Sequence, residues 1–170
     1  KEASYFSYDL ETTSTDSLNA DIVGIAIAIK EREAYYIPVT ADMNVSSPKG
    51  DAALAFNFDA STSSDKNLIL SEVLKKIKPI LESGEIKKCG QNIKYDMLVT
   101  SRYGIIMKGI DFDTMIASYI IDPDGQINLD ALAKRYMNYK MVPISDLIGT
   151  GKNQKNMRDV PVDIASDYAC

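Results

Sequence analysis

The sequence predicts an α/β domain in which a mixed β-sheet carries helices on both faces. Runs rich in β-branched and aromatic residues open the chain, helical periodicity begins after residue 66, and one short apolar run separates two helical segments. Strands followed by a helix, a strand and more helices are typical of such a sheet. The 170 residues, 45% of them apolar, suffice for one sizeable core and predict a single domain over 1–170.

The opening strands are predicted at residues 3–9, 22–29 and 34–39. The charged segment 30–33 joins the last two as a turn, so the three strands form an antiparallel meander. Segment 40–65 mixes Ser, Asp, Asn, Pro and Gly with few periodic apolar positions. It predicts a surface insertion, to which we assign no function.

Helical spacing of apolar residues begins after Lys66 and predicts a helix with a buried face formed by Leu70, Val73, Leu74, Ile77 and Leu81. Pro79 is expected to kink or interrupt the end of this helix, and Gly84 to stop it. A short strand is predicted at 86–89. Further helices are predicted at 93–103, 113–121, 128–139 and 162–170, with a turn at 123–125.

The charge balance does not favour a protein that grips duplex DNA by charge alone. Lys and Arg total 19 against 24 Asp and Glu, a formal net charge of −5, whereas such proteins carry basic surfaces. An enzyme that meets nucleic acid through metal ions on carboxylates is compatible with this balance, because bound cations reverse the local sign. The absence of histidine excludes histidine bases, Ser-His-Asp and Cys-His catalysis, and nearly all catalytic zinc sites.

Cysteine usage and hydropathy are those of a cytoplasmic protein. Cys89 and Cys170 lack metal-ligand spacing, so we expect two free thiols. No apolar stretch approaches the roughly 18 residues of a membrane span, and no basic segment precedes a hydrophobic signal core. We therefore expect no membrane association and a cytoplasmic location.

Two carboxylates stand at the end of the first predicted strand. Asp9 and Glu11 are spaced i, i+2, so their side chains share one face of a strand where its ladder is ending. Oxygen ligands of this kind suit Mg²⁺, and two such ions roughly 3.5 to 4 Å apart activate water in phosphodiester cleavage. The alternative is a plain strand end with solvated acids.

A third acid lies in the segment 90–96. Asn92 and Asp96 are spaced i, i+4 and share a face near the start of a helix. A phosphate that approached Asn92 would meet backbone donors at the helix N-terminus as well as a metal held by Asp96. The alternative is that Asn92 is an N-cap and Asp96 lies on an exposed first turn.

Tyr168 lies in the last predicted helix. Its hydroxyl could orient a water, whereas most helical tyrosines simply pack a ring at a boundary. On this residue alone, packing is the preferred interpretation.

Together these segments resemble the three motifs of the DEDD superfamily of 3'-5' exonucleases, in its tyrosine branch. The segments concerned are Asp9-Leu10-Glu11-Thr12, residues 90–96, and Tyr168. The resemblance is closest to the proofreading domain of bacterial family A DNA polymerases, DNA polymerase I. It covers almost the whole chain, because segments 112–115, 118–120, 129–136 and 151–154 also follow in the family's order.

The resemblance implies a ribonuclease H-like fold and hydrolysis with two divalent cations, Mg²⁺ or Mn²⁺. By this resemblance Asp9 and Glu11 match the metal ligands of the first motif, and Asp96 matches the acid of the second metal. Tyr168 matches the tyrosine that positions the attacking water. The expected activity is removal of 3'-terminal nucleotides from mispaired DNA, with the polymerase domain in the same parent chain.

The resemblance also implies residues that hold the terminal nucleotides of a frayed single strand. They are Thr12, Leu18, Gln91, Asn92 and Tyr95. The loop before Leu18 is longer than the family's. Met157 stands where the family often has an aromatic residue, and it can still pack against a base.

The third motif of the family is Tyr-x-x-x-Asp, and its aspartate would fall two residues beyond Cys170. The chain therefore resembles a domain truncated inside a helix, with one metal site weakened by the missing fourth carboxylate. Two alternatives follow from this comparison. One is a catalytically silent structural domain of the polymerase, and the other is an exoribonuclease of the same superfamily.

Overall fold

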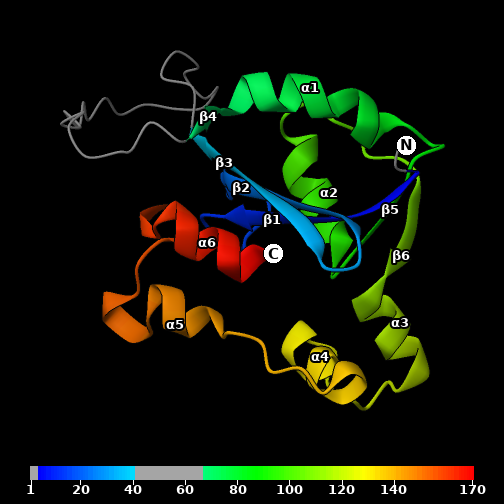
Figure 1. Ribbon diagram of the computed structural model, residues 1–170, viewed down its shortest axis with the longest axis vertical. Helices are drawn as coiled ribbons and strands as arrows, with labels where there is room; N and C mark the ends of the chain where they lie inside the picture. The colour runs from blue at the N-terminus through cyan, green and yellow to red at the C-terminus, as the bar shows by residue number, and fades with distance from the viewer. Residues whose placement is uncertain (1–3, 41–66) are drawn as a thin grey trace.

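A six-stranded sheet runs through the protein in the order β4-β3-β2-β1-β5-β6. The computed structural model describes residues 4–40 and 67–170, and Figure 1 shows the sheet between its helices. The strands are β1 Tyr5–Thr12, β2 Ile22–Lys30, β3 Glu33–Thr40, β4 Leu68–Ile69, β5 Lys87–Gly90 and β6 Ile110–Asp113.

The pairing confirms the predicted antiparallel meander and the predicted mixed sheet. β1 pairs with β2 and β2 with β3 in antiparallel fashion. The remaining pairs, β1 with β5, β5 with β6 and β3 with β4, are parallel. β1 is therefore an inner strand, with an antiparallel neighbour on one side and a parallel neighbour on the other.

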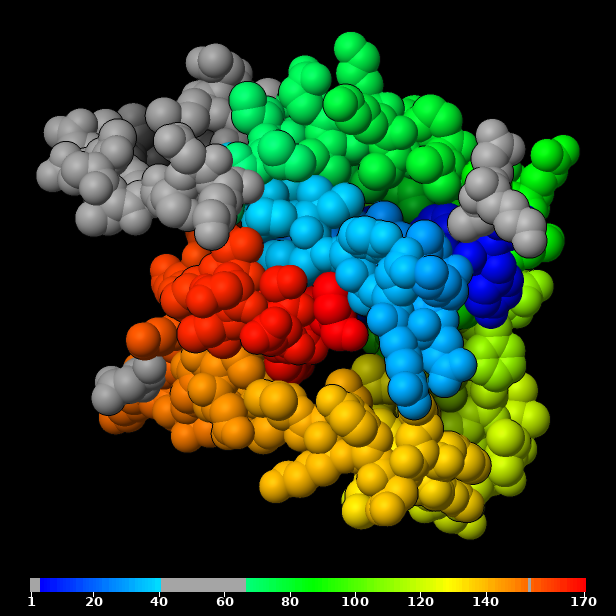
Figure 2. Space-filling model, viewed as in Figure 1, coloured from blue at the N-terminus to red at the C-terminus, as the bar shows by residue number. Residues whose placement is uncertain are grey.

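The helices follow the strands along the chain. They are α1 Leu70–Glu82, α2 Ile93–Ser101, α3 Thr114–Ile121, α4 Leu129–Met137, α5 Ile144–Ile148 and α6 Val162–Ala169, with short 3₁₀ turns η1 Gly151–Asn153 and η2 Met157–Asp159. In Figure 1, α1 and α2 lie on one side of the sheet and α6 on the other. Figure 2 shows α6 against β3 on the molecular surface. The predicted helices on both faces are confirmed.

The main core fills the space between the sheet and helices α1 and α2. Alternate residues of β1 face it: Phe6, Tyr8 and Leu10 are buried there. Each buried side chain of this size contributes roughly 1.5–3 kcal/mol. A second, smaller cluster on the opposite face joins α6 and η2 to the sheet through Met157, Val160 and Ala165.

Some elements differ from the sequence-based expectations. α1 continues through Pro79 to Glu82, so the helix is not interrupted there, although Pro79 has no N–H to donate to the carbonyl of Lys75. The strands β4 and β6 and the helix α5 were not predicted, since each has five residues or fewer and no readable period. The predicted insertion at 40–65 lies outside the described residues, apart from Thr40 at the end of β3.

No helix within the described parts of the chain is long and apolar enough to cross a membrane.

Gly90 makes the close approach of β5 to β1 feasible, and this yields a prediction. A Cβ at this position would lie 2.9 Å from the carbonyl oxygen of Tyr8 and 3.3 Å from the Cβ of Ile93. Because the first neighbour is backbone, we expect Gly90→Ala to lower the free energy of unfolding by about 1–3 kcal/mol. Urea unfolding measures this loss. Gly84→Ala is the control, since a Cβ there meets nothing within 4 Å, and equal losses in the two variants would contradict the packing argument.

Candidate active site

Asp9 and Glu11 project from the face of β1 opposite the main core, as the strand period predicts. The exposed fraction of Glu11 is only 9%, whereas Asp9 is exposed. Glu11 is paired with Gly24 of β2 in the antiparallel ladder. The two carboxylates thus share a face, with Glu11 enclosed by protein and Asp9 open to solvent.

Asp96 joins this strand from α2. The ladder between β1 and β5 ends at the pair Ser7–Cys89, so Leu10 has no partner on that side of β1. Its backbone N–H donates instead to the Asp96 carboxylate, at 3.1 Å. Asp96 is only 2% exposed, so the alternative that placed it on an exposed first turn is wrong.

The start of α2 differs from the expected N-cap. Asn92 adopts a left-handed backbone conformation, with φ 56° and ψ 42°, and its side chain makes no capping hydrogen bond. The N–H groups of Asn92 and Ile93 donate to the carboxylate of Asp113 at 3.1 and 2.9 Å. The backbone donors that were expected to meet a phosphate therefore already bind an internal anion.

Desolvation by the surrounding protein raises the pKa of each of the three acids, and the charge of Asp9 raises the pKa values of Glu11 and Asp96 further. Desolvation raises the pKa of Asp9 to about 6. Desolvation, and then the charge of Asp9, raise the pKa of Glu11 to about 7 and that of Asp96 to about 8. The pKa of Tyr168 rises to about 12, through desolvation and then the charges of Glu11 and Asp9. Its hydroxyl therefore keeps its proton at neutral pH and lies near the acids.

The acids suit a hard divalent cation by their chemistry. Within residues 4–40 and 67–170, no Lys or Arg forms an ion pair with Asp9, Glu11 or Asp96, so their charges have no internal partner. Carboxylate oxygens are the ligands that Mg²⁺ and Mn²⁺ prefer. In the same described residues, however, no three His, Cys, Asp or Glu side chains are gathered closely enough to hold a metal. The residues therefore fit a cation as donors, although their side chains do not converge on one point.

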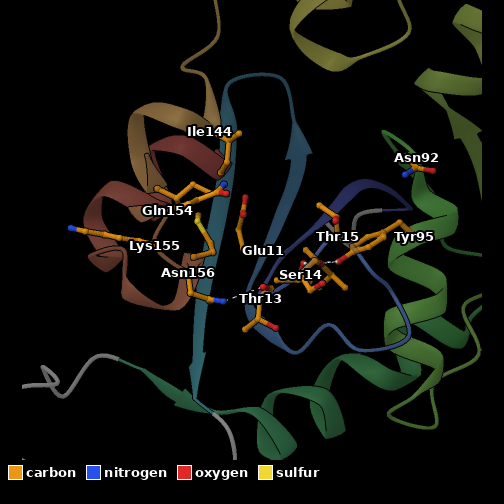
Figure 3. A pocket seen from close by; sticks show the side chains of 14 residues that line it. Glu11, Thr13, Ser14, Thr15, Asn92, Tyr95, Ile144, Gln154, Lys155 and Asn156 are labelled. Atoms are coloured by element: carbon orange, nitrogen blue, oxygen red, sulfur yellow. Dashed lines mark hydrogen bonds between the residues drawn. The ribbon is translucent and has the colours of Figure 1, made fainter. Parts of the chain in front are cut away.

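A pocket of about 680 Å³ opens beside Glu11 (Figure 3). One wall comes from the end of β1 and the following loop, another from α2, and the third from α5 and the segment around η2. The lining residues are Leu10, Glu11, Thr12, Thr13, Ser14, Thr15, Asn92, Tyr95, Ile144, Ile148, Gln154, Lys155, Asn156 and Met157. Glu11 is the only carboxylate among them, and hydroxyl and amide groups dominate the polar surface.

Hydrogen bonds hold the loop after β1 to both other walls, as Figure 3 shows. The hydroxyls of Thr12 and Tyr95 lie 2.6 Å apart and share a hydrogen bond, and one of the two donates its proton to the carbonyl of Ser14, which both hydroxyls approach. On the other side, the Asn156 amide donates to the carbonyl of Thr13 at 3.0 Å. The walls of the pocket are therefore connected through backbone carbonyls of one loop.

Five of the predicted site residues line this pocket: Glu11, Thr12, Asn92, Tyr95 and Met157. Leu18 does not, and its side chain is 69% exposed. Gln91 does not either, because its side chain binds Thr114 and the carbonyl of Ile127. Tyr168 packs in the second cluster beside Met157.

Several residues of the pocket were not singled out from the sequence. They are Thr13, Ser14, Thr15, Ile144, Ile148, Lys155 and Asn156. A local signal existed for Asn156, which forms a capping box with Asp159 at the start of η2. The isoleucines carry no such signal, since their place in the pocket depends on the fold.

An antiparallel meander extended by parallel strands, with helices on both faces, is a ribonuclease H-like fold, and in this protein its inner strand carries paired acids with a third acid from the next helix beside them. The solved structure of Brucella melitensis NrnC with bound Mg²⁺ is similar in fold, with a TM-score of 0.62 at 13% identity. This likeness covers 99% of the present chain and 65% of that protein.

The chain belongs to the 3'-5' exonuclease family, whose sequence profile matches residues 1–170. It is 31% identical to DNA polymerase I of Pseudomonas aeruginosa over 172 residues, and 32% identical to DNA polymerase I of Borreliella burgdorferi over 169 residues. Each comparison covers 99% of this chain but only 17% and 16% of the relative. The predicted resemblance to the exonuclease domain of DNA polymerase I is confirmed.

The raised carboxyl pKa values predict how stability depends on pH without metal. A carboxyl whose pKa is higher in the folded state binds more protons there, so its contribution to stability is lost as pH rises. The loss should run from about pH 4, the ordinary carboxyl value, to about pH 8, the value for folded Asp96. We expect the free energy of unfolding, measured with a chelator present, to fall across this range.

Asp96→Asn should flatten this fall, because the neutral amide retains an oxygen for the Leu10 N–H and removes the titrating group. Asp124→Asn, on an exposed turn, is the matched control and should leave the slope unchanged. Added Mg²⁺ should stabilise the wild-type protein more at pH 8 than at pH 5, since cations bind deprotonated ligands. A slope that is identical in wild type and Asp96→Asn would contradict the assignment.

Proposed function

We propose that this chain removes nucleotides from the 3' end of single-stranded or frayed DNA by hydrolysis, as the proofreading domain of a DNA polymerase I. The observation that carries the proposal is the juxtaposition of Asp9, Glu11 and Asp96 with the polar pocket beside Glu11. Because these three acids form no ion pair with a Lys or Arg of the described residues, their carboxylates are available to bind the divalent cations that promote phosphodiester cleavage. A pocket with an apolar lining, whose polar groups are mainly neutral hydroxyls and amides, suits a nucleotide bound without reading its sequence.

Asp9, Glu11 and Asp96 would hold two divalent cations, Mg²⁺ or Mn²⁺. When bound, these ions supply an activated water and stabilise the leaving oxygen. Of the chain's own groups, Glu11 lines the pocket, and Asp96 is held against β1 by the Leu10 N–H. Tyr168, protonated at neutral pH, would align the water for in-line attack through its hydroxyl.

The pocket would receive the unpaired 3'-terminal nucleotides. Tyr95 offers a ring for stacking while its hydroxyl is engaged with Thr12, and Met157 offers a soft apolar surface. Asn92 lies at the rim, near the start of α2 (Figure 3). Leu18 and Gln91 complete the set that the family resemblance assigns to substrate. A frayed end is favoured because an unpaired base can be splayed out at lower cost.

The polymerase domain of the same parent chain is the proposed partner. Its support is that the chain spans about one sixth of the length of the DNA polymerase I relatives that it matches. A cytoplasmic location belongs to the same proposal, because a DNA polymerase works where the DNA is.

Asp96→Ala tests the role of the buried acid. In the chain extended through the next helix, we expect hydrolysis of a 5'-labelled single-stranded DNA to fall by at least about 10³-fold, because one metal ligand is lost. Binding of the same DNA to the pocket should change little. Rates are read from gels with Mg²⁺ or Mn²⁺. Unchanged degradation by Asp96→Ala would sink the assignment of this residue.

Extension of the chain tests the missing carboxylate and the alternatives. We expect stepwise shortening of DNA by the extended form and weak or no shortening by residues 1–170, because the family resemblance places a fourth ligand four residues after Tyr168. Equal activity in both forms would show that this ligand is unnecessary. Faster cleavage of an RNA of the same sequence would favour the exoribonuclease. If residues 1–170 and the extended form both fold but degrade no DNA, the alternative of a catalytically silent structural domain is favoured.

A further inference from the structure

Asp113, the last residue of β6, connects two helices outside the acid cluster. Its exposed fraction is 9%. Its carboxylate accepts four backbone hydrogen bonds, and the donors are the N–H groups of Asn92 at 3.1 Å, Ile93 at 2.9 Å, Met115 at 2.8 Å and Ile116 at 3.2 Å. The first two begin α2 and the last two begin α3. One carboxylate therefore caps two helices.

This arrangement is electrostatically favourable. The N-terminus of a helix carries a partial positive charge, so a carboxylate there is stabilising. Hydrogen bonds to an ionised acceptor are also stronger than neutral ones. Asp113 meets two such termini, so its position fixes the start of α2 relative to the start of α3.

The position of α2 matters because it carries Asp96 one turn after its start. α2 has no capping bond from its own Asn92, whose left-handed conformation turns the chain out of β5. The contacts of Asp113 therefore replace the local cap. They hold the end of α2 that faces β1, where Asp96 accepts the N–H of Leu10.

We propose that Asp113 is a positioning residue of the exonuclease site: by holding the first turn of α2, it fixes where Asp96 is presented to a divalent cation. This inference rests on the proposed function, in which Asp96 is a metal ligand. Asp113 does not line the pocket, and it would act through the first turn of α2. Removing its bonds to α2 should therefore weaken metal binding even where α3 keeps its cap.

The two oxygens of Asp113 allow this separation. One oxygen accepts from Asn92, Met115 and Ile116, and the other accepts from Ile93 alone. In Asp113→Asn the amide oxygen can keep the three bonds of the first oxygen. The NH₂ group then faces the N–H of Ile93, where two donors meet and no hydrogen bond forms. This variant loosens α2 and retains the cap of α3.

Mn²⁺ binding, followed by the EPR signal of the free ion, measures the effect in the chain extended through the next helix. We expect Asp113→Asn to weaken Mn²⁺ affinity about 10-fold, as is usual for residues that orient metal ligands. Hydrogen exchange should become faster at the start of α2 and stay slow at the start of α3. Asn128→Ala, which removes the side-chain cap of α4, is the matched control and should bind Mn²⁺ as wild type does.

Four results would overturn the inference. One is wild-type Mn²⁺ affinity in Asp113→Asn despite faster exchange at the start of α2, and another is an equal loss of affinity in Asn128→Ala. An Asp113→Asn protein that does not fold would make the residue a determinant of stability instead. Failure of the wild-type protein to bind Mn²⁺ would overturn the proposed function as well, and this case is distinguishable because hydrogen exchange needs no metal.

Discussion

The divergence of β1 from β5 after Ser7 is the constraint on which the rest of the site depends. Up to that point the two strands share a parallel ladder, and beyond it β1 continues to Thr12 with its other edge still paired to β2. The divergence leaves the N–H of Leu10 to a side chain instead of a strand. Asp96 takes it, so an acid from α2 is drawn to the strand that carries Asp9 and Glu11.

The fold holds these like charges together with little internal compensation. The backbone N–H of Leu10 donates a hydrogen bond to the Asp96 carboxylate. The surface ion pairs of the described residues lie elsewhere. Asp113 shows the contrasting solution, in which four backbone N–H groups surround one carboxylate. A buried anion is thus either fully covered by donors, as at Asp113, or left short of them, as at Glu11. A carboxylate with few hydrogen-bond donors, such as Glu11, retains free oxygen atoms that a cation could bind.

Periodicity and local motifs were sufficient to predict the mixed sheet, the meander and the shared face of Asp9 and Glu11. They were insufficient where a residue's surroundings come from distant chain. Asp96 is buried because β1 lies beside it, 86 positions away in sequence. The cap of α3 by Asp113 was readable from its place before the helix, but its cap of α2 was not. Gln91 likewise binds the carbonyl of Ile127, which no local pattern shows.

The hydrogen bond between Asn156 and the carbonyl of Thr13 spans 143 positions, and this bears on the order in which the chain acquires its structure. During synthesis the N-terminal strands emerge first and can form their antiparallel meander early, because those contacts are local. The loop after β1 gains this bond only once the chain has been made as far as Asn156. The pocket beside Glu11 is therefore completed later than the meander. A nascent chain can have a folded sheet before it has this pocket.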